Sequence, residues 1–179
     1  MRRVQIAGLA AVLAAVATYP AVAQQKQRVS PHETVSATLG GKKVTIEYGR
    51  PYLKGRKAVG GQLVPLGKVW RTGADEATKL TSEAPLMIGS LKVPAGSYSL
   101  FTLPETGQWT LIVNKTADQW GAFSYDAKAD LGRVPMKVAA TSSPVEQFTI
   151  KLEPAGGDAA KLELAWENTS ATVPITVAK

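Results

Sequence analysis

A stretch near the end of the chain decides the fold class. Residues 148–167 have the sequence FTIKLEPAGGDAAKLELAWE. On each side of the central PAGGD, apolar side chains alternate with polar or small ones, which is typical of strands that bury one face. A short connection that contains glycine suits a hairpin. The stretch therefore predicts two antiparallel strands, Phe148–Glu153 and Leu162–Glu167.

Alternation of this kind recurs along most of the chain, and no long amphipathic helix is visible. Turn signals such as Gly40-Gly41 and Gly89-Ser90 separate the runs. Pro174 indicates that the last strand lies at a sheet edge, and Asn168-Thr169-Ser170 indicates a turn before it. About nine short strands at this spacing predict an all-β fold, an antiparallel β-sandwich with a long Gly/Arg-rich loop. The expected strands are Thr34–Leu39, Lys43–Tyr48, Met87–Ile88, Leu91–Val93, Tyr98–Leu103, Trp109–Asn114, Phe148–Glu153, Leu162–Glu167 and Thr172–Val177.

Large apolar side chains on these strands have the size and spacing of a two-layer core. They are Leu100, Trp109, Leu111, Val113, Phe148, Ile150, Leu152, Leu162, Leu164 and Trp166. We assign Phe148 and Trp166 to this core and give them no role in function.

The N-terminus has the features of a secretion signal. Arg2-Arg3 precedes an apolar stretch from Val4 to Ala17, and Pro20 precedes the small-x-small sequence Ala21-Val22-Ala23. As a helix the apolar stretch would rise only about 21 Å, short of the ~30 Å hydrocarbon core of a membrane. We therefore expect residues 1–23 to be a cleaved signal peptide and the protein to be periplasmic or secreted.

The expected mature chain has the size of one domain. We expect residues 24–32 to be flexible and residues 33–179 to form a single β-sandwich domain. The sequence contains no cysteine, so disulfides and a lipid anchor are excluded. The whole chain has a net charge of +7, and loss of Arg2-Arg3 leaves 19 basic and 14 acidic residues, or 19 − 14 = +5. This excess weakly favours acidic partners, but it is not clustered enough to indicate nucleic acid, and we expect neither a nucleic-acid partner nor a membrane span.

A long Gly/Arg-rich stretch interrupts the strand pattern, and long connections in compact domains usually serve a function. Residues 49–73 contain six glycines, two prolines and six basic residues but no acidic one. Arginine presents a rigid set of donors to carboxylate, phosphate or sulfate, and glycine lets backbone N–H groups approach an anion. The stretch therefore predicts an anion-binding loop. Its basic residues are Arg50, Lys54, Arg56, Lys57, Lys68 and Arg71.

The same residues also fit a purely structural loop. Arg71 would then pair with Asp75 or Glu76, and Arg50 with Glu47. A long irregular loop has many backbone groups to satisfy, and buried arginines often satisfy them. Because an ion-pair network and a ligand site look alike in sequence, both interpretations stay open.

A second irregular stretch, residues 115–132, contains several carboxylates. Asp118, Asp126 and Asp130 lack the close alternating spacing of a calcium loop, so we expect them to be solvated. A glycosidase pair of Glu76 with Asp126 or Asp130 is an alternative that would act on an envelope polysaccharide.

Other catalytic chemistry is poorly represented. The only histidine is His32, which follows Pro31 in a segment that we expect to be loosely held, and there is no G-x-S-x-G motif. No H-E-x-x-H motif or EF-hand spacing occurs either. We therefore expect no catalytic residue, metal or cofactor, and we favour a binding module over an enzyme.

Several motifs resemble those of a known family. They are YGRP (48–51), GGQLVPLGKVWRTGADEAT (60–78), PAGSYSLFTLP (94–104), WTLIVN (109–114) and QWG (119–121). Together they resemble the bacterial domain-of-unknown-function family 2911, from about Ser30 to Val177. The resemblance implies an exported, β-rich protein and no particular activity. The family usually has Asn where this chain has Asp75, a change that places a carboxylate within reach of Arg71.

The function that we expect is non-catalytic binding of an anionic small molecule or an acidic glycan. Arginines would supply the charge, and Tyr52 and Trp70 an apolar wall. A polysaccharide hydrolase that uses paired carboxylates and a structural or assembly module are the alternatives. The candidate ligand-binding residues are Arg50, Tyr52, Arg56, Trp70, Arg71 and Glu76.

Overall fold

The structure, a computed structural model, describes residues 27–179. The expected signal peptide lies outside the described residues. Nothing helical between residues 27 and 179 has the length and apolarity of a membrane span. The elements are β1 (His32–Leu39), β2 (Lys42–Gly49), β3 (Thr78–Ser82), β4 (Leu86–Ile88), β5 (Leu91–Val93), β6 (Gly96–Glu105), β7 (Gln108–Asn114), the 3₁₀ turn η1 (Ala127–Ala129), β8 (Asp130–Gly156) and β9 (Ala159–Val177).

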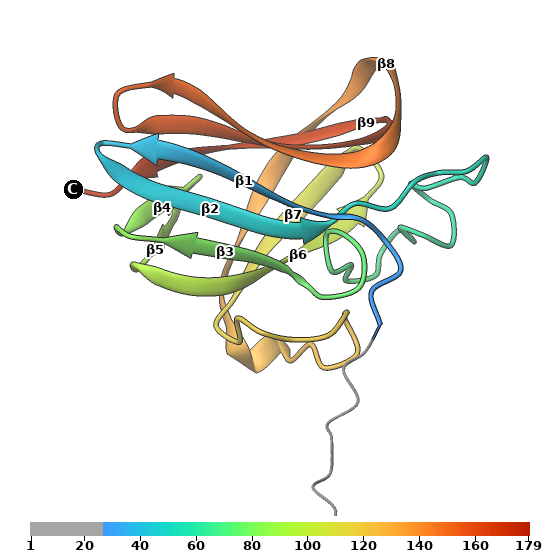
Figure 1. The fold of residues 1–179 in the computed structure, drawn as a ribbon, viewed down its shortest axis with the longest axis horizontal. Helices are drawn as coiled ribbons and strands as arrows, with labels where there is room; N and C mark the ends of the chain where they lie inside the picture. Colours follow the sequence, from blue (N-terminus) through green and yellow to red (C-terminus); the bar gives the residue numbers. More distant parts are fainter. Residues whose placement is uncertain (1–26) are drawn as a thin grey trace, which may run out of the picture.

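The nine strands of the described residues form one antiparallel sheet, in the order β1-β2-β3-β6-β7-β8-β9-β4-β5. Residues 130–136 of β8 pair with β7, and β8 pairs with β9 from Lys137 onward. The sheet therefore folds over at β8, and the β8–β9 hairpin lies above β1 and β2 in Figure 1. The sheet does not close into a barrel. The prediction of an all-β, antiparallel fold is confirmed.

The β8–β9 hairpin contains the alternating stretch that predicted the fold, but its strands are longer than we expected. Leu152 pairs with Leu162, as a hairpin around the glycine-containing connection requires. β9 then continues through residues 168–170, where the predicted turn is wrong. Thr169 and Ser170 pair with β8 there, and the positive φ of Glu167, 55°, marks an irregularity in the strand.

Pro174 lies inside the sheet and not at its edge, so this prediction is also wrong. Thr172 is the last residue of β9 to pair with β8, and Ile175 is the first to pair with β4. Pro174 lies where β9 changes partners, a place where a missing N–H is tolerated. Its carbonyl still accepts a hydrogen bond from Gly89 N at 2.9 Å.

The strand β3 was not expected from the sequence. Its only large apolar side chain is that of Leu80, which is too few for an alternation signal. β3 pairs with β2 on one side and with β6 on the other. It therefore fixes the segment before it, residues 71–77, beside the end of β2.

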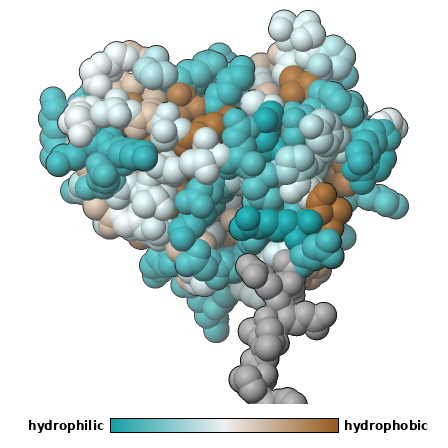
Figure 2. Space-filling view, in the orientation of Figure 1, coloured by the Kyte–Doolittle hydropathy of each residue, from teal (hydrophilic) through white to brown (hydrophobic). Residues whose placement is uncertain are grey.

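An aromatic cluster joins the two layers of the folded sheet. The Trp70 ring lies 5.0 Å from Phe148, 6.0 Å from Trp166 and 6.4 Å from Trp109, measured between centroids. Every predicted core side chain is buried, none more than 8% exposed. The surface is different: the face in Figure 2 is mainly hydrophilic, with hydrophobic residues in small separate patches.

Candidate functional site

The Gly/Arg-rich stretch is a structured loop that projects beyond the ends of β1 and β2 (Figure 1). Two carboxylates of the β8–β9 hairpin hold its backbone. Glu146 Oε1 accepts a hydrogen bond from Lys54 N at 2.8 Å. Glu167 Oε2 accepts from Ala58 N and Val59 N at 3.0 and 3.1 Å. These charge-assisted bonds fix the loop against the sandwich.

Arg50, the first candidate residue, fastens β2 to the outer side of β8. It forms an ion pair with Glu33 and not with Glu47. Its Nε donates to Phe148 O at 3.1 Å and its Nη2 to Thr149 Oγ1 at 3.0 Å. Contacts of this kind, from arginine to protein carbonyl, hydroxyl and carboxylate groups, are those expected if the loop has a structural role.

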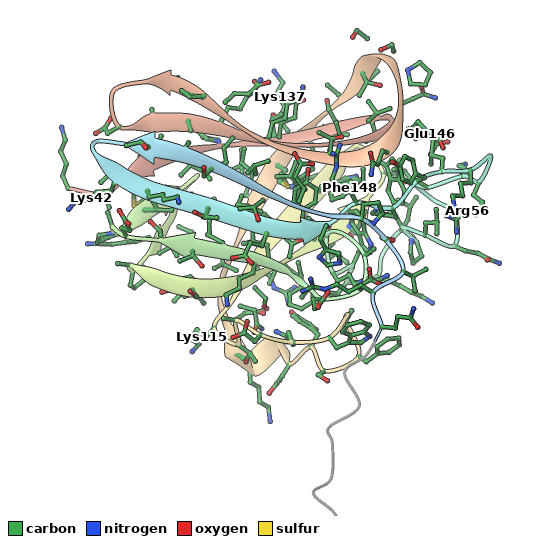
Figure 3. The ribbon with its side chains drawn as sticks, viewed as in Figure 1. Lys42, Arg56, Lys115, Lys137, Glu146 and Phe148 are labelled. Atoms are coloured by element: carbon green, nitrogen blue, oxygen red, sulfur yellow. The ribbon has the colours of Figure 1, made fainter. Side chains whose placement is uncertain are left out.

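Arg56 and Tyr52 lie on the projecting loop, where Figure 3 labels Arg56. Arg56 Nε donates to Leu53 O at 2.9 Å, and its Nη2 donates to Tyr52 O at 2.8 Å. The guanidinium therefore folds back on its own turn of the loop. Tyr52 is 39% exposed, so part of the residue is open to solvent.

Trp70 lies in the aromatic cluster of the core and is 5% exposed. Its backbone N–H and C=O both bond to Thr102 of β6, at 2.8 and 2.9 Å. A ring packed on three other aromatic rings has no face left for a ligand from solvent. The contribution of Trp70 is therefore to the packing of the loop on the sheet.

Arg71 differs from the other two arginines. Its Nε is buried and has no hydrogen-bond partner within the described part of the chain. No ion pair among residues 27–179 includes Arg71, so neither expected partner, Asp75 or Glu76, meets it in that way. Burial lowers the pKa of Arg71, and the charge of Asp75 opposes this.

The segment from Arg71 to Glu76 has a strained backbone. Thr72 and Asp75 have φ values of 56° and 63°, a region that residues other than glycine rarely adopt. Close packing holds the segment there: a Cβ on Gly49 of β2 would lie 2.2 Å from Ala74 O. Strain that the surrounding structure maintains is concentrated at functional sites.

Asp75 holds the segment that precedes β1. Its carboxylate accepts hydrogen bonds from Val29 N at 3.2 Å, Ser30 N at 3.0 Å and His32 Nε2 at 3.2 Å. Burial alone would raise the pKa of Asp75, but these three bonds outweigh it and the pKa is lowered. Val29, Ser30 and His32, which fall in the stretch that we expected to be flexible, are thus hydrogen-bonded to the domain. Hydrogen bonds from backbone N–H groups to a buried carboxylate leave no pattern in the sequence that would predict them.

Glu76 lies beside Asp75 and faces the same segment. Its Oε1 pairs with Arg28 Nε at 2.8 Å. Its Oε2 lies 3.5 Å from His32 Nε2, a nitrogen that is closer to Asp75 Oδ2, at 3.2 Å. Glu76 Oε2 is consequently buried without a hydrogen bond from any residue between 27 and 179.

Gln119 supplies a second unpaired acceptor. Its Nε2 donates to Ser99 Oγ at 2.9 Å and to Thr116 O at 2.8 Å, and Asn114 Oδ1 lies 3.3 Å away. Three acceptors around Nε2 fix the orientation of the amide, because the opposite orientation would bring oxygens together. Gln119 Oε1 is therefore an acceptor, and it is buried with no donor among the described residues.

Glu76 and Gln119 line one cavity of about 350 Å³. Ala77 N donates to Gln119 O at 3.0 Å, which brings the two segments together. Lys79 pairs with Asp118 at 2.8 Å, and this hydrogen bond raises the pKa of Lys79. Carboxylates outnumber the permanent cations Arg28 and Lys79 in the lining, so the cavity disfavours anions. The carboxylates of the lining are Glu33, Glu47, Glu76 and Asp118, and its nitrogen-bearing side chains include Arg28, His32 and Lys79.

The carboxylates of the proposed glycosidase pair lie elsewhere. Neither Asp126 nor Asp130 lines the cavity of Glu76. Asp126 caps η1 by accepting from Lys128 N at 2.9 Å. Asp130 accepts from Tyr125 Oη and from Arg133 Nη2, both at 2.8 Å; burial and the Asp130 bond raise the pKa of Tyr125 to about 12. In the region that the structure covers, no group of three or more His, Asp or Glu side chains is placed to hold a metal ion.

Sequence reasoning named Glu76 but missed its neighbours in the cavity. The sequence suggested for His32 only the role of a catalytic base, and for Gln119, although it lies in the second irregular stretch, no role. A usable signal was present, since the segments 48–51, 60–78 and 119–121, which carry the family resemblance, each supply cavity-lining residues. Motifs that lie far apart in a chain and meet at one cavity point to a site there.

The comparisons with known proteins concern the family alone. A family model described as "Protein of unknown function (DUF2911)" matches residues 30–175. No curated protein and no solved structure matches the chain.

Proposed function

Because the chain belongs to the DUF2911 family, a family of unknown function, we propose its function from its geometry: non-catalytic binding of a small molecule that donates hydrogen bonds through hydroxyl or ammonium groups. One observation carries the proposal. Glu76 and Gln119 line the cavity, and Glu76 Oε2 and Gln119 Oε1 are buried acceptors that receive no hydrogen bond from residues 27–179; His32 Nε2 lies 3.5 Å from Glu76 Oε2. Buried polar atoms nearly always have partners, so a small turn of each side chain toward the cavity, where a bound molecule supplies the donor, would satisfy both oxygens.

The surroundings of the two acceptors support a preformed site. The cavity, about 350 Å³, lies within the range of small-molecule sites, about 300 to 1,000 Å³. The orientation of Gln119 is fixed by its own hydrogen bonds, and Glu76 is fixed by Arg28. Acceptors that are already positioned bind a ligand at a smaller entropic cost.

The negative charge of the cavity lining disfavours the anionic ligand that the sequence suggested and favours a neutral or positively charged one. An anion would lie beside the carboxylates of Glu47 and Glu76, and Arg28 and Lys79 are already paired with Glu76 and Asp118. Like charges at such short range disfavour binding. Neutral polyols, sugars and amines are therefore the classes that we expect.

A thermal-shift screen of the expected mature chain, residues 24–179, tests the proposal. We expect one or more polyols, sugars, amino alcohols or amines to raise the melting temperature in a concentration-dependent way, because ligands that bind only the folded state stabilise it. Phosphate, sulfate and small carboxylates should give no shift beyond that of a matched salt.

Two variants locate the effect. Glu76→Gln removes the charged acceptor and should weaken the response to the hit. Glu105→Gln makes the same charge change at an exposed position outside the cavity and should leave the response unchanged. If no hydrogen-bond donor shifts the melting temperature, or if the two variants respond alike, the proposal is rejected.

The hydrolase alternative is distinguished in the same experiment. A hydrolase would need a second carboxylate near Glu76 in the cavity. Glu47 is the candidate, because it lines the cavity and forms no ion pair with any other described residue. Chromatography of each hit after incubation with the protein shows whether it is cleaved. Cleavage that Glu76→Gln abolishes would replace the binding module with an enzyme.

A further inference from the structure

The projecting loop carries exposed cations that the cavity does not use. None of them takes part in an ion pair within the described chain, and residues 49–73 contain no acidic side chain to neutralise them. The nearest hairpin carboxylates, Glu146 and Glu167, are directed to backbone N–H groups of the loop. The charges of the cations therefore remain available to a partner, although Nε and Nη2 of Arg56 already donate to carbonyls of the loop. The cations are Lys54, Arg56, Lys57 and Lys68.

Apolar groups lie among these cations. Leu66 and Tyr52 are 43% and 39% exposed, although most large apolar side chains of the described residues are buried. A Cβ placed on Gly60 would lie 3.8 Å from Leu66 Cδ1 and 3.9 Å from Lys57 Nζ. A leucine methyl group and a lysine ammonium group therefore both lie beside Gly60 at the surface of the loop. Lysine beside an exposed leucine suits a lipid–water interface, where the cation meets headgroups and the apolar group enters the acyl boundary.

The loop is ordered without a partner. Gly60 N donates to Val64 O at 2.9 Å, which closes its tip, and Gly67 N donates to Pro104 O at 2.8 Å, which ties it to β6. Glu146 and Glu167 hold the opposite side. A surface that is already rigid loses little conformational entropy on docking.

From the charge, the neighbouring apolar group and the rigidity, we propose that this loop docks the protein on an anionic lipid surface. Lys54, Arg56, Lys57 and Lys68 would lie over phosphate groups, with Leu66 directed into the interface. An acidic polysaccharide would satisfy the cations but would leave Leu66 exposed to water, which is why a lipid surface is favoured. The proposal does not depend on the cavity and its ligand.

Flotation with lipid vesicles tests the docking surface. The expected mature chain should bind vesicles of phosphatidylcholine mixed with phosphatidylglycerol, should not bind phosphatidylcholine alone, and should be released as salt screens the charges. The variant Lys54→Gln, Arg56→Gln, Lys57→Gln, Lys68→Gln should bind at least about 100-fold more weakly, since each of the four basic residues contributes roughly 5-fold near an anionic surface. Leu66→Ser should reduce the binding that persists at high salt.

A matched control removes the same charge elsewhere. Lys42, Lys92, Lys115 and Lys137 are exposed, and Figure 3 shows three of them, Lys42, Lys115 and Lys137, far from the loop of Arg56. Their replacement by Gln should leave vesicle binding within about 2-fold, because the contact depends on local charge within a Debye length. Circular dichroism confirms that each variant is folded.

Four results would overturn the proposal. The wild-type chain could ignore anionic vesicles, or the control variant could lose as much binding as the loop variant. Free glycerol phosphate could compete at concentrations far below those of the lipid phosphate, which would indicate a small-anion site. Loop-dependent binding of dextran sulfate without binding of vesicles would make the partner an acidic polymer.

Discussion

The carboxylate of Asp75 organises the strained segment and the chain that crosses it. Its φ of 63° is a conformation that Asp and Asn tolerate better than most residues. The charge of Asp75 adds to this a strong acceptor for Val29 N, Ser30 N and His32. Asp75 thus fits the strained conformation of the segment from Arg71 to Glu76, and its carboxylate binds the segment that precedes β1.

Asp75→Asn should reveal this role through pH. The folded-state pKa of Asp75 is below its ordinary value of 3.8, so its contribution is complete above about pH 4 and is lost as the pH falls through the lower, folded-state pKa. At pH 7 the substitution should reduce the free energy of unfolding by about 1 to 3 kcal/mol. The difference between the two proteins, measured by urea unfolding, should shrink below about pH 4; a difference that is constant with pH would contradict the role of the charge.

Trp70 and Tyr52 should respond very differently to truncation, although both were candidates for one apolar wall. Trp70→Ala removes a ring from the aromatic core and should cost about 3 to 5 kcal/mol of unfolding free energy. Tyr52→Ala removes a partly exposed ring and should cost less than about 1 kcal/mol. Thermal and urea unfolding measure both, and equal losses would show that Trp70 is not a core residue.

At the scale of elements, β1 and β8 face each other across the open side of the sheet. Tyr48 of β2 bridges this opening: its hydroxyl accepts from Ile150 N at 2.9 Å and lies 3.4 Å from Ile150 O. Burial raises the pKa of Tyr48, so the hydroxyl stays protonated. The Tyr48 hydroxyl therefore satisfies the backbone groups of Ile150, which a neighbouring strand would satisfy if the sheet closed into a barrel.

Tyr48→Phe should therefore weaken the edge of β8 locally. The loss of the hydroxyl leaves Ile150 N without its acceptor, which should cost about 1 to 3 kcal/mol. Hydrogen exchange at the Ile150 amide should become faster, by a factor that corresponds to a similar free energy. Tyr98→Phe, which removes a hydroxyl bonded to Pro94 O at 3.1 Å, is the control and should leave Ile150 unchanged; equal acceleration in both would contradict the bridge.

The contact between β2 and the strained segment depends on Gly49. A Cβ there would meet backbone atoms of Ala74, which cannot turn aside as a side chain can. Gly49→Ala should displace the segment, cost more than about 3 kcal/mol and abolish any ligand response of the cavity. Gly107→Ala has no atom within 4 Å of the new Cβ and a φ of 76°, so it should cost only about 1 kcal/mol. Equal costs would show that the close approach is relaxed in solution.

Local patterns predicted most elements, and pairing between distant segments accounts for the errors. Alternation located both strands of the β8–β9 hairpin, because the pattern depends only on which face is buried. The turn at residues 168–170 and the edge at Pro174 were wrong because β9 exchanges one partner for another along its length, which local sequence does not encode. β3 was missed for the same reason: its neighbours, and not its own side chains, make it a strand.

At the scale of the whole molecule, the two candidate surfaces have opposite chemistry. The cavity gathers carboxylates and unpaired acceptors from β1, β2 and two loops, whereas the projecting loop presents cations at the end of the sandwich. The sequence placed every candidate residue except Glu76 on the loop, residues 49–73, because clustered arginines are conspicuous. Of these, Glu76 alone lines the cavity. The rest of that site arises from residues spread over the chain, which only the folded sheet brings together.

The most direct test of the central claim is a crystal structure of residues 24–179 with the best ligand of the screen. The account predicts that the ligand occupies the cavity, with hydroxyl or ammonium donors within about 3.2 Å of Glu76 Oε2 and Gln119 Oε1. A ligand bound anywhere else, or these two oxygens satisfied by neighbouring protein groups in the crystal, would contradict it.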